Sequence, residues 1–127
     1  MARKTFVNGE VLTDTDINTY LTNETTLTSS TGTAYAVLTS DRYKTLVFSP
    51  ATAGTVTIGT ATAFQAGERV DIIQDGTAVV RIAASGVTLA GAGSTAAAFE
   101  IAEQDNGCSV ICVDTDEYRI IGKASVV

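Results

Sequence analysis

Residues 72–80 read IIQDGTAVV, two apolar runs rich in β-branched residues that are separated by Asp75 and Gly76. An Asp-Gly pair between two such runs is typical of a two-residue β-hairpin, because both residues tolerate the positive φ angles of a type I′ turn. The sequence therefore predicts a hairpin that joins strands at 69–74 and 78–83.

Outward from this segment, short β-branched runs continue from residue 34 to the C-terminus, separated by Gly, Asp, Asn or Ser. Alternation with a period of two, interrupted by turn residues at short intervals, is typical of an all-β sandwich or barrel. We predict an all-β fold, a small antiparallel β-sandwich or barrel-like domain over residues 34–127, with residues 91–94 (GAGS) as a connection. About nine short strands are expected, at 34–38, 44–48, 55–58, 69–74, 78–83, 87–90, 97–102, 109–114 and 118–122.

Four of these strands contain a pair of adjacent Ile or Val residues. Adjacent residues of a strand point to opposite faces of the sheet, whereas a solitary sandwich buries only its inner faces. The pairs therefore favour a domain that associates with copies of itself, although single exposed Val or Ile residues are also common on ordinary surfaces. The expected self-association residues are Ile73, Val79, Ile111 and Ile121, from the pairs at 72–73, 79–80, 110–111 and 120–121.

Residues 1–33 lack this alternation, and we interpret them as an N-terminal arm followed by a Thr- and Ser-rich linker at 22–33. Thr13 is a candidate cap for a short helix whose apolar stripe has i, i+3, i+4 spacing. A helix of two or three turns is marginal alone in water, so the stripe must be buried against this domain or a partner. The candidate anchoring residues of the arm are Phe6, Val11, Leu12, Ile17, Tyr20 and Leu21.

The composition excludes several classes of chemistry. The chain has no histidine, so it holds neither a Ser-His-Asp triad nor a His-containing metal site. Cys108 and Cys112 are four apart in a predicted strand, about 13 Å against a disulfide limit of about 7 Å, which favours buried, reduced thiols. The acidic run at 114–117 fits a solvated turn better than a calcium loop. We therefore expect that the chain is not an enzyme and that it binds no cofactor or metal ion.

The net charge and the N-terminal sequence limit the kinds of partner and the cellular location that we expect. The net charge of −6 argues against binding to nucleic acid or to an anionic membrane surface. The N-terminus lacks the apolar core of a secretory signal, and the chain has no stretch of 18 apolar residues. We therefore expect synthesis in a cytoplasm and no membrane span.

Two parts of the chain resemble proteins of tailed bacteriophages. Residues 4–21, KTFVNGEVLTDTDINTYL, resemble the start of many phage tail, fibre and head-appendage proteins. Segments between residues 64 and 122 are similar to a small β domain of phage fibres and capsid decoration proteins, with Tyr118 where many relatives have Trp. These segments are FQAGERVDIIQ (64–74), VVRI (79–82), GVTL (86–89), CSVIC (108–112) and YRIIG (118–122).

The resemblance implies a homotrimeric β domain anchored to the particle by its N-terminal arm. It leads us to expect a capsid decoration or head-fibre protein, made in the host cytoplasm and held on the outer surface of the virion by the major capsid protein or another virion protein. A short tail fibre or baseplate protein that binds host-surface glycans is the alternative. A glycan depolymerase with two paired carboxylates is a third hypothesis, which the small size of the chain disfavours.

Overall fold

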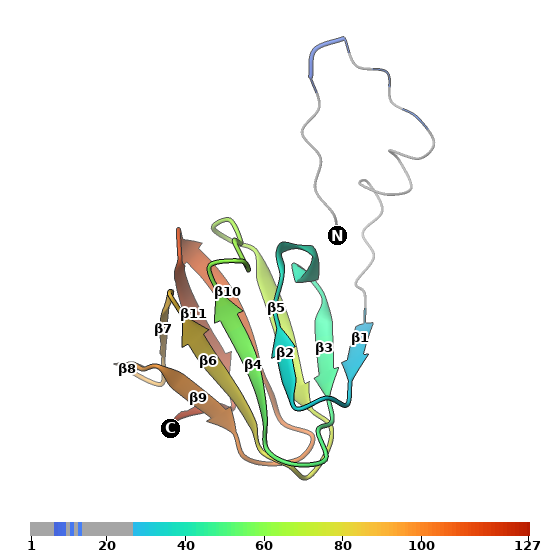
Figure 1. Cartoon of the computed structure of the whole chain (residues 1–127). Helices are drawn as coiled ribbons and strands as arrows, with labels where there is room; N and C mark the ends of the chain where they lie inside the picture. Colours follow the sequence, from blue (N-terminus) through green and yellow to red (C-terminus); the bar gives the residue numbers. More distant parts are fainter. Residues whose placement is uncertain (1–6, 10, 12, 14–26) are drawn as a thin grey trace.

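The computed structural model describes residues 7–9, 11, 13 and 27–127 of the chain. This described part is nearly all β, with twelve strands in two sheets and one short 3-10 helix at Thr39–Asp41. Figure 1 shows the two sheets stacked as layers, and neither sheet closes into a barrel. The predicted all-β sandwich is thus confirmed.

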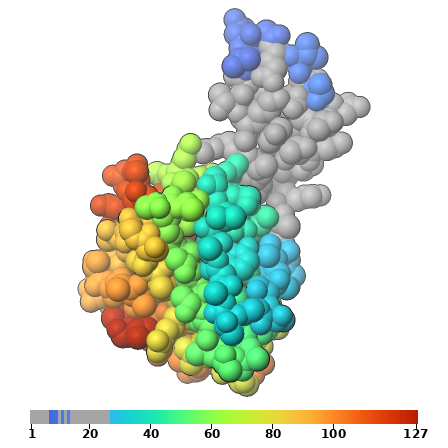
Figure 2. Space-filling model, in the orientation of Figure 1, coloured from blue at the N-terminus to red at the C-terminus, as the bar shows by residue number. Residues whose placement is uncertain are grey.

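We refer to the two layers as sheet A and sheet B. Sheet A has seven strands, in the spatial order β1 (Leu27–Ser30), β3 (Thr45–Phe48), β5 (Arg69–Gln74), β10 (Gly107–Asp114), β11 (Glu117–Gly122), β7 (Thr88–Gly91) and β8 (Ser94–Thr95). Sheet B has five, in the order β12 (Ser125–Val126), β9 (Ala98–Ile101), β6 (Val80–Ser85), β4 (Gly54–Gly59) and β2 (Ala34–Ala36). In Figure 2 the strands of sheet B face the reader and follow one another as adjacent coloured bands.

The first six strands alternate between the two sheets, so the chain winds as a flattened coil. Strands β1, β3 and β5 are parallel neighbours in sheet A, and β2, β4 and β6 are parallel neighbours in sheet B. A strand that returns to its sheet only after crossing the other layer runs in the same direction as its predecessor. The prediction of an antiparallel sandwich is therefore wrong for this half, and antiparallel pairs such as β5–β10 and β10–β11 occur in the second half.

The hairpin predicted at Asp75-Gly76 is also wrong, because β5 belongs to sheet A and β6 to sheet B. Neither residue has a positive φ. The buried Gln74 side chain fixes the crossing instead: its Nε2 donates to the Gly76 carbonyl at 3.1 Å, and its Oε1 accepts the Val80 N–H at 3.2 Å. A hydrogen-bonded side chain at the end of β5 thus directs residues 75–79 into the other layer.

The type I′ turn predicted at Asp75-Gly76 occurs instead at Ala92-Gly93. Both residues have positive φ, 49° and 78°, and they join the antiparallel strands β7 and β8. Positive φ at both central residues is the requirement of a type I′ hairpin. The prediction of a connection at 91–94 is confirmed for its two central residues, while Gly91 and Ser94 belong to the strands.

Each of the nine predicted strands overlaps an observed strand. Strands β1, β8 and β12 are additional, and β1 lies inside the segment predicted as a linker. That prediction is wrong for residues 27–30, since β1 pairs with β3 and belongs to the sandwich. The helix predicted after Thr13 lies outside the described residues.

The core lies between the inner faces of the two sheets and contains three fully buried aromatic rings, those of Phe48, Phe99 and Tyr118. The outer face of sheet B carries small or polar residues at alternating positions, such as Thr55, Thr57 and Ala83. Apolar residues on both faces of a strand are therefore a property of sheet A, where the candidate site lies.

Candidate functional site

Three of the four predicted self-association residues lie on the outer face of sheet A. Their preceding neighbours Ile72, Val110 and Ile120 are buried in the core, so Ile73, Ile111 and Ile121 point the other way. Ile73 and Ile111 are half-buried, and Ile121 is 61% exposed. The structure therefore places these three side chains on one surface.

The strand register arranges this surface in rows across β5, β10 and β11. One row contains Ile73 and Gly107; the next contains Asp71, Ser109 and Ile121; the third contains Arg69, Ile111 and Arg119. The Ser109 hydroxyl donates to the Asp71 carboxylate in the middle row. We call these eight residues, together with Glu117 at the start of β11, the outer patch.

A hollow of about 390 Å³ lies in the outer patch, between Ile73 and Ile121 and over Gly107 and Ser109. Gly107, which has no side chain, forms part of its floor. A Cβ there would lie 2.7 Å from the carbonyl oxygen of Ile72, so the close approach of β5 and β10 requires glycine. A second hollow, of about 500 Å³, lies beyond Ile121 over the β7–β8 hairpin. Ile121 thus stands as a ridge between two depressions.

The charges of the outer patch are balanced, although the chain carries a net charge of −6. Arg69 and Arg119 are matched there by Asp71 and Glu117, and the Arg69 Nε lies 3.9 Å from Asp71 Oδ1. A second acidic molecule is repelled less by such a face than by a surface with the average charge of the chain.

Val79, the fourth predicted self-association residue, is not part of the outer patch. It precedes β6 of sheet B, is half-buried, and its carbonyl oxygen accepts the N–H of Gly54 at 3.0 Å. The prediction placed Val79 inside a strand, but the crossing between the sheets extends to that residue. The structure therefore places Val79 apart from the other three predicted residues.

The candidate anchoring residues are described only in part. Val11 is 78% exposed. The remaining five, Phe6, Leu12, Ile17, Tyr20 and Leu21, lie outside the described residues.

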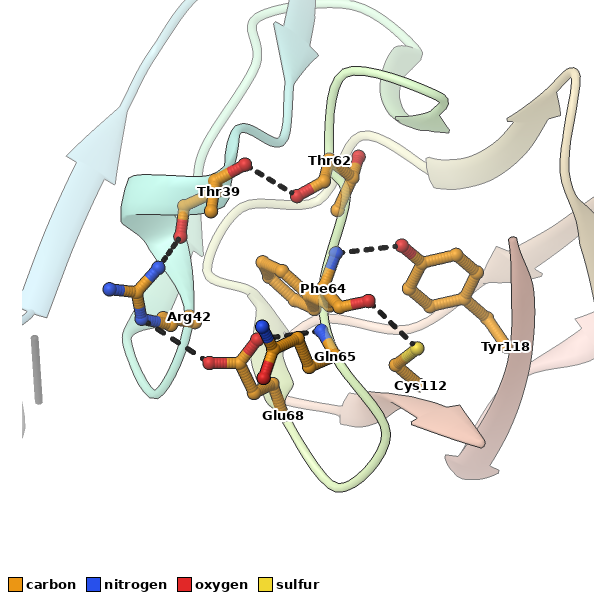
Figure 3. Close-up of polar contacts among 8 residues, drawn as sticks. All are labelled: Thr39, Arg42, Thr62, Phe64, Gln65, Glu68, Cys112 and Tyr118. Carbon is orange, nitrogen blue, oxygen red and sulfur yellow. Dashed lines mark hydrogen bonds and ion pairs between the residues drawn. The ribbon is translucent and has the colours of Figure 1, made fainter. Parts of the chain in front are cut away.

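A polar network closes one end of the sandwich, and sequence reasoning did not find it (Figure 3). The connection from β4 to β5 passes over this end, and the Phe64 N–H donates to the Tyr118 hydroxyl oxygen at 3.2 Å. The Cys112 thiol donates to the Phe64 carbonyl at 3.2 Å. Further along, the buried Glu68 carboxylate accepts the Gln65 N–H at 2.6 Å and lies 3.3 Å from the Arg42 Nε.

This network holds the β4–β5 connection against sheet A. Arg42 also donates from Nη1 to the Thr39 carbonyl at 3.3 Å, and the Thr39 hydroxyl donates to the Thr62 carbonyl at 3.0 Å. Four of the contacts in Figure 3 link the β4–β5 connection to other segments of the chain, which is the pattern of a structural clasp. The other two, Arg42–Thr39 and Gln65–Glu68, each lie within one connection. The sequence does not indicate that Glu68 is buried, because residues 65–68 (QAGE) have the composition of an ordinary exposed turn.

Both cysteines are free and buried, as predicted. Burial raises the pKa of the Cys108 thiol to about 12, with the Asp71 carboxylate adding to the shift. Burial also raises the pKa of the Cys112 thiol. Because the thiolate is the nucleophilic form, these residues are held in their unreactive state at neutral pH.

The raised pKa values predict a loss of stability at alkaline pH. Tyr35 also has its pKa raised to about 12, first by burial and then by its hydrogen bond to Asp41. Groups whose pKa is higher in the folded state contribute stability that is complete below the unfolded-state values, 9.0 for Cys108 and 10.0 for Tyr35, and that is lost as the pH rises toward 12. The urea concentration at the unfolding midpoint should therefore decrease as the pH is raised from 8 to about 11.

The variant Cys108→Val serves as the control for this decline. It removes the thiol with little change in volume, so its urea midpoint should fall less steeply with pH than that of the parent. Identical slopes for the two proteins would show that the buried thiol does not cause the effect.

No family model, curated protein or solved structure matches the chain. Within the described residues, no three or more Cys, Asp or Glu side chains gather as a metal-binding group, and no helix has the length and hydropathy to span a membrane.

Proposed function

We propose that the chain is a structural protein of a tailed-phage virion, a capsid decoration or head-fibre protein. In this proposal the β-sandwich associates as a homotrimer, and the N-terminal arm attaches the trimer to the major capsid protein. The observation that carries the proposal is the outer patch, where three isoleucines lie exposed or half-buried on the middle strands of sheet A.

The size of the hydrophobic term supports association through such a patch. Full burial of an isoleucine side chain contributes about 1.5–3 kcal/mol. In a closed ring each copy has two neighbours and makes the same contact with both, so contacts that are weak one by one add up in a cyclic oligomer. The balanced charge of the patch reduces the repulsion that the net charge of −6 imposes on copies of this chain.

The resemblance of residues 4–21 to phage appendage proteins supports the role of the arm. Three arms on one trimer bind at a high effective concentration once the first has docked, so each arm needs only modest affinity. The apolar stripe of Ile17, Tyr20 and Leu21 supplies the chemistry for such docking.

The attachment is tested with phage capsids that lack this protein. We expect the full chain to bind them, and a chain without residues 1–21 to lose binding while remaining a folded trimer, because every buried core residue of the described part lies after residue 36. Cosedimentation measures binding, and sedimentation equilibrium with circular dichroism checks assembly and folding.

A triple variant that replaces Ile17, Tyr20 and Leu21 by serine keeps the chain length and should behave like the deletion. Undiminished capsid binding by both altered chains would refute the anchoring role. Antibody labelling of intact particles then separates the head from the tail, and labelling confined to the tail would contradict decoration of the capsid.

A further inference from the structure

We infer that Ile121 of one copy inserts into the hollow over Gly107 of a neighbouring copy, so that each copy contributes both a knob and a hole to its contacts. This inference rests on the proposed self-association and specifies its contact. Its occupant is a second copy of this chain.

Ile121 has the properties of a knob. It lies on β11, an inner strand of sheet A with β10 on one side and β7 on the other, and yet its side chain is 61% exposed. Two other aliphatic residues of sheet A are exposed in less regular surroundings: Leu27 lies on the edge strand β1, and Val113 lies at the irregularity between Cys112 and Asp114. Ile121, in contrast, is in register with Ser109 of β10. An exposed isoleucine in the middle of a sheet is the position at which a partner gains the most from burial.

The hollow beside it has the properties of a hole. Its walls are the apolar side chains of Ile73 and Ile121, and its floor is formed at Gly107 and Ser109. A side chain at residue 107 would clash with the backbone of β5, since its Cβ would lie 2.7 Å from the Ile72 carbonyl oxygen. At Gly107 the floor of the depression is therefore fixed by the backbone of the sheet.

The charges around the hollow favour a second copy as the occupant. The outer patch contains two arginines, Arg69 and Arg119, and two acids, Asp71 and Glu117. An identical patch supplies the opposite charge for each of these groups, whereas a partner of single sign matches only half of them. Each copy also carries the knob and the hole on the same face, so identical contacts repeat around a closed ring.

The first experiment compares two full-length variants that each exchange one exposed aliphatic residue for lysine. Ile121→Lys places a charge on the knob, and Leu38→Lys, at a residue that is 50% exposed and precedes the 3-10 helix, is the matched control. Sedimentation equilibrium should show association weakened about a hundredfold or more for Ile121→Lys and unchanged for Leu38→Lys. Unchanged far-ultraviolet circular dichroism excludes unfolding as the cause, since loss of association by itself lowers the thermal midpoint.

The second experiment traps the contact between copies. A tagged Ile121→Cys chain is mixed with an untagged Ser109→Cys chain, and disulfide-linked heterodimers are counted after oxidation. The native thiols are buried, so they do not compete. We expect heterodimers to exceed those formed with a Thr57→Cys partner, whose new thiol lies on sheet B.

The outcomes separate this inference from the proposed function. If the parent chain is a trimer and Ile121→Lys assembles equally well, the contact is elsewhere and the inference is wrong, while the trimer stands. If the parent chain is a monomer at all concentrations, the self-association itself is wrong. If Ile121→Lys loses capsid binding while a monomeric parent binds, the hollow receives the capsid protein, which also overturns the inference.

Discussion

Replacing Arg42 with methionine should lower the free energy of unfolding by about 3–5 kcal/mol, the cost of removing one partner of a buried ion pair. Glu68 is only 2% exposed, and the Arg42 Nε lies 3.3 Å from its carboxylate. Methionine keeps much of the volume but removes the compensating charge, so the carboxylate stays buried without its guanidinium. Urea unfolding at neutral pH measures the change.

The double variant Arg42→Met, Glu68→Leu is the control for this prediction. Removal of both charges leaves no uncompensated carboxylate, and apolar replacement of a whole buried pair is often neutral. The double variant should therefore recover much of the lost stability, minus the hydrogen bond from the Gln65 N–H to Glu68. A single variant within 1 kcal/mol of the parent would contradict the interpretation of this pair as a clasp.

Replacing Tyr118 with alanine should cost about 3–5 kcal/mol, as for other buried aromatic residues. The ring is fully buried, its centroid lies 6.2 Å from that of Phe64, and its hydroxyl accepts the Phe64 N–H. The alanine variant therefore loses core packing and leaves a buried N–H without its acceptor.

The variant Tyr118→Phe separates these two losses. It keeps the ring and removes only the hydroxyl, so it should cost about 1–3 kcal/mol, the penalty of an unsatisfied buried donor. Both changes are measured from urea midpoints at constant slope. Equal costs for the two variants would show that packing of the ring contributes nothing, contrary to its complete burial.

The strands could be predicted from the sequence because alternation and β-branched runs are local properties. Their partners could not, because a parallel and an antiparallel strand with one buried face have the same pattern. Asp75-Gly76 illustrates the difference: the pair marks a change of direction, but the buried Gln74 side chain sends the chain to the opposite sheet. That hydrogen bonding depends on the folded surroundings.

The candidate site was predictable for a related reason. The adjacent pairs ending in Ile73, Ile111 and Ile121 lie inside real strands, where alternation places the second residue outside. The same rule failed for Val79, because β6 begins only at Val80. The hollow at Gly107 and the Arg42–Glu68 pair arise from contacts between distant segments, and neither has a local signature.

The coiled path of the first six strands bears on how the chain acquires its structure. Leu27 pairs with Thr45, and Thr45 with Asp71, so each of these strands must wait for a whole circuit of chain before it gains a hydrogen-bonded neighbour. Closing such circuits costs entropy before any pairing rewards it, which slows folding. Moreover, β10 and β11 are late in the sequence but occupy the middle of sheet A. A growing chain that has not yet released residue 114 from the ribosome therefore exposes an unpaired edge of β5, the stage at which nascent copies are most prone to aggregate.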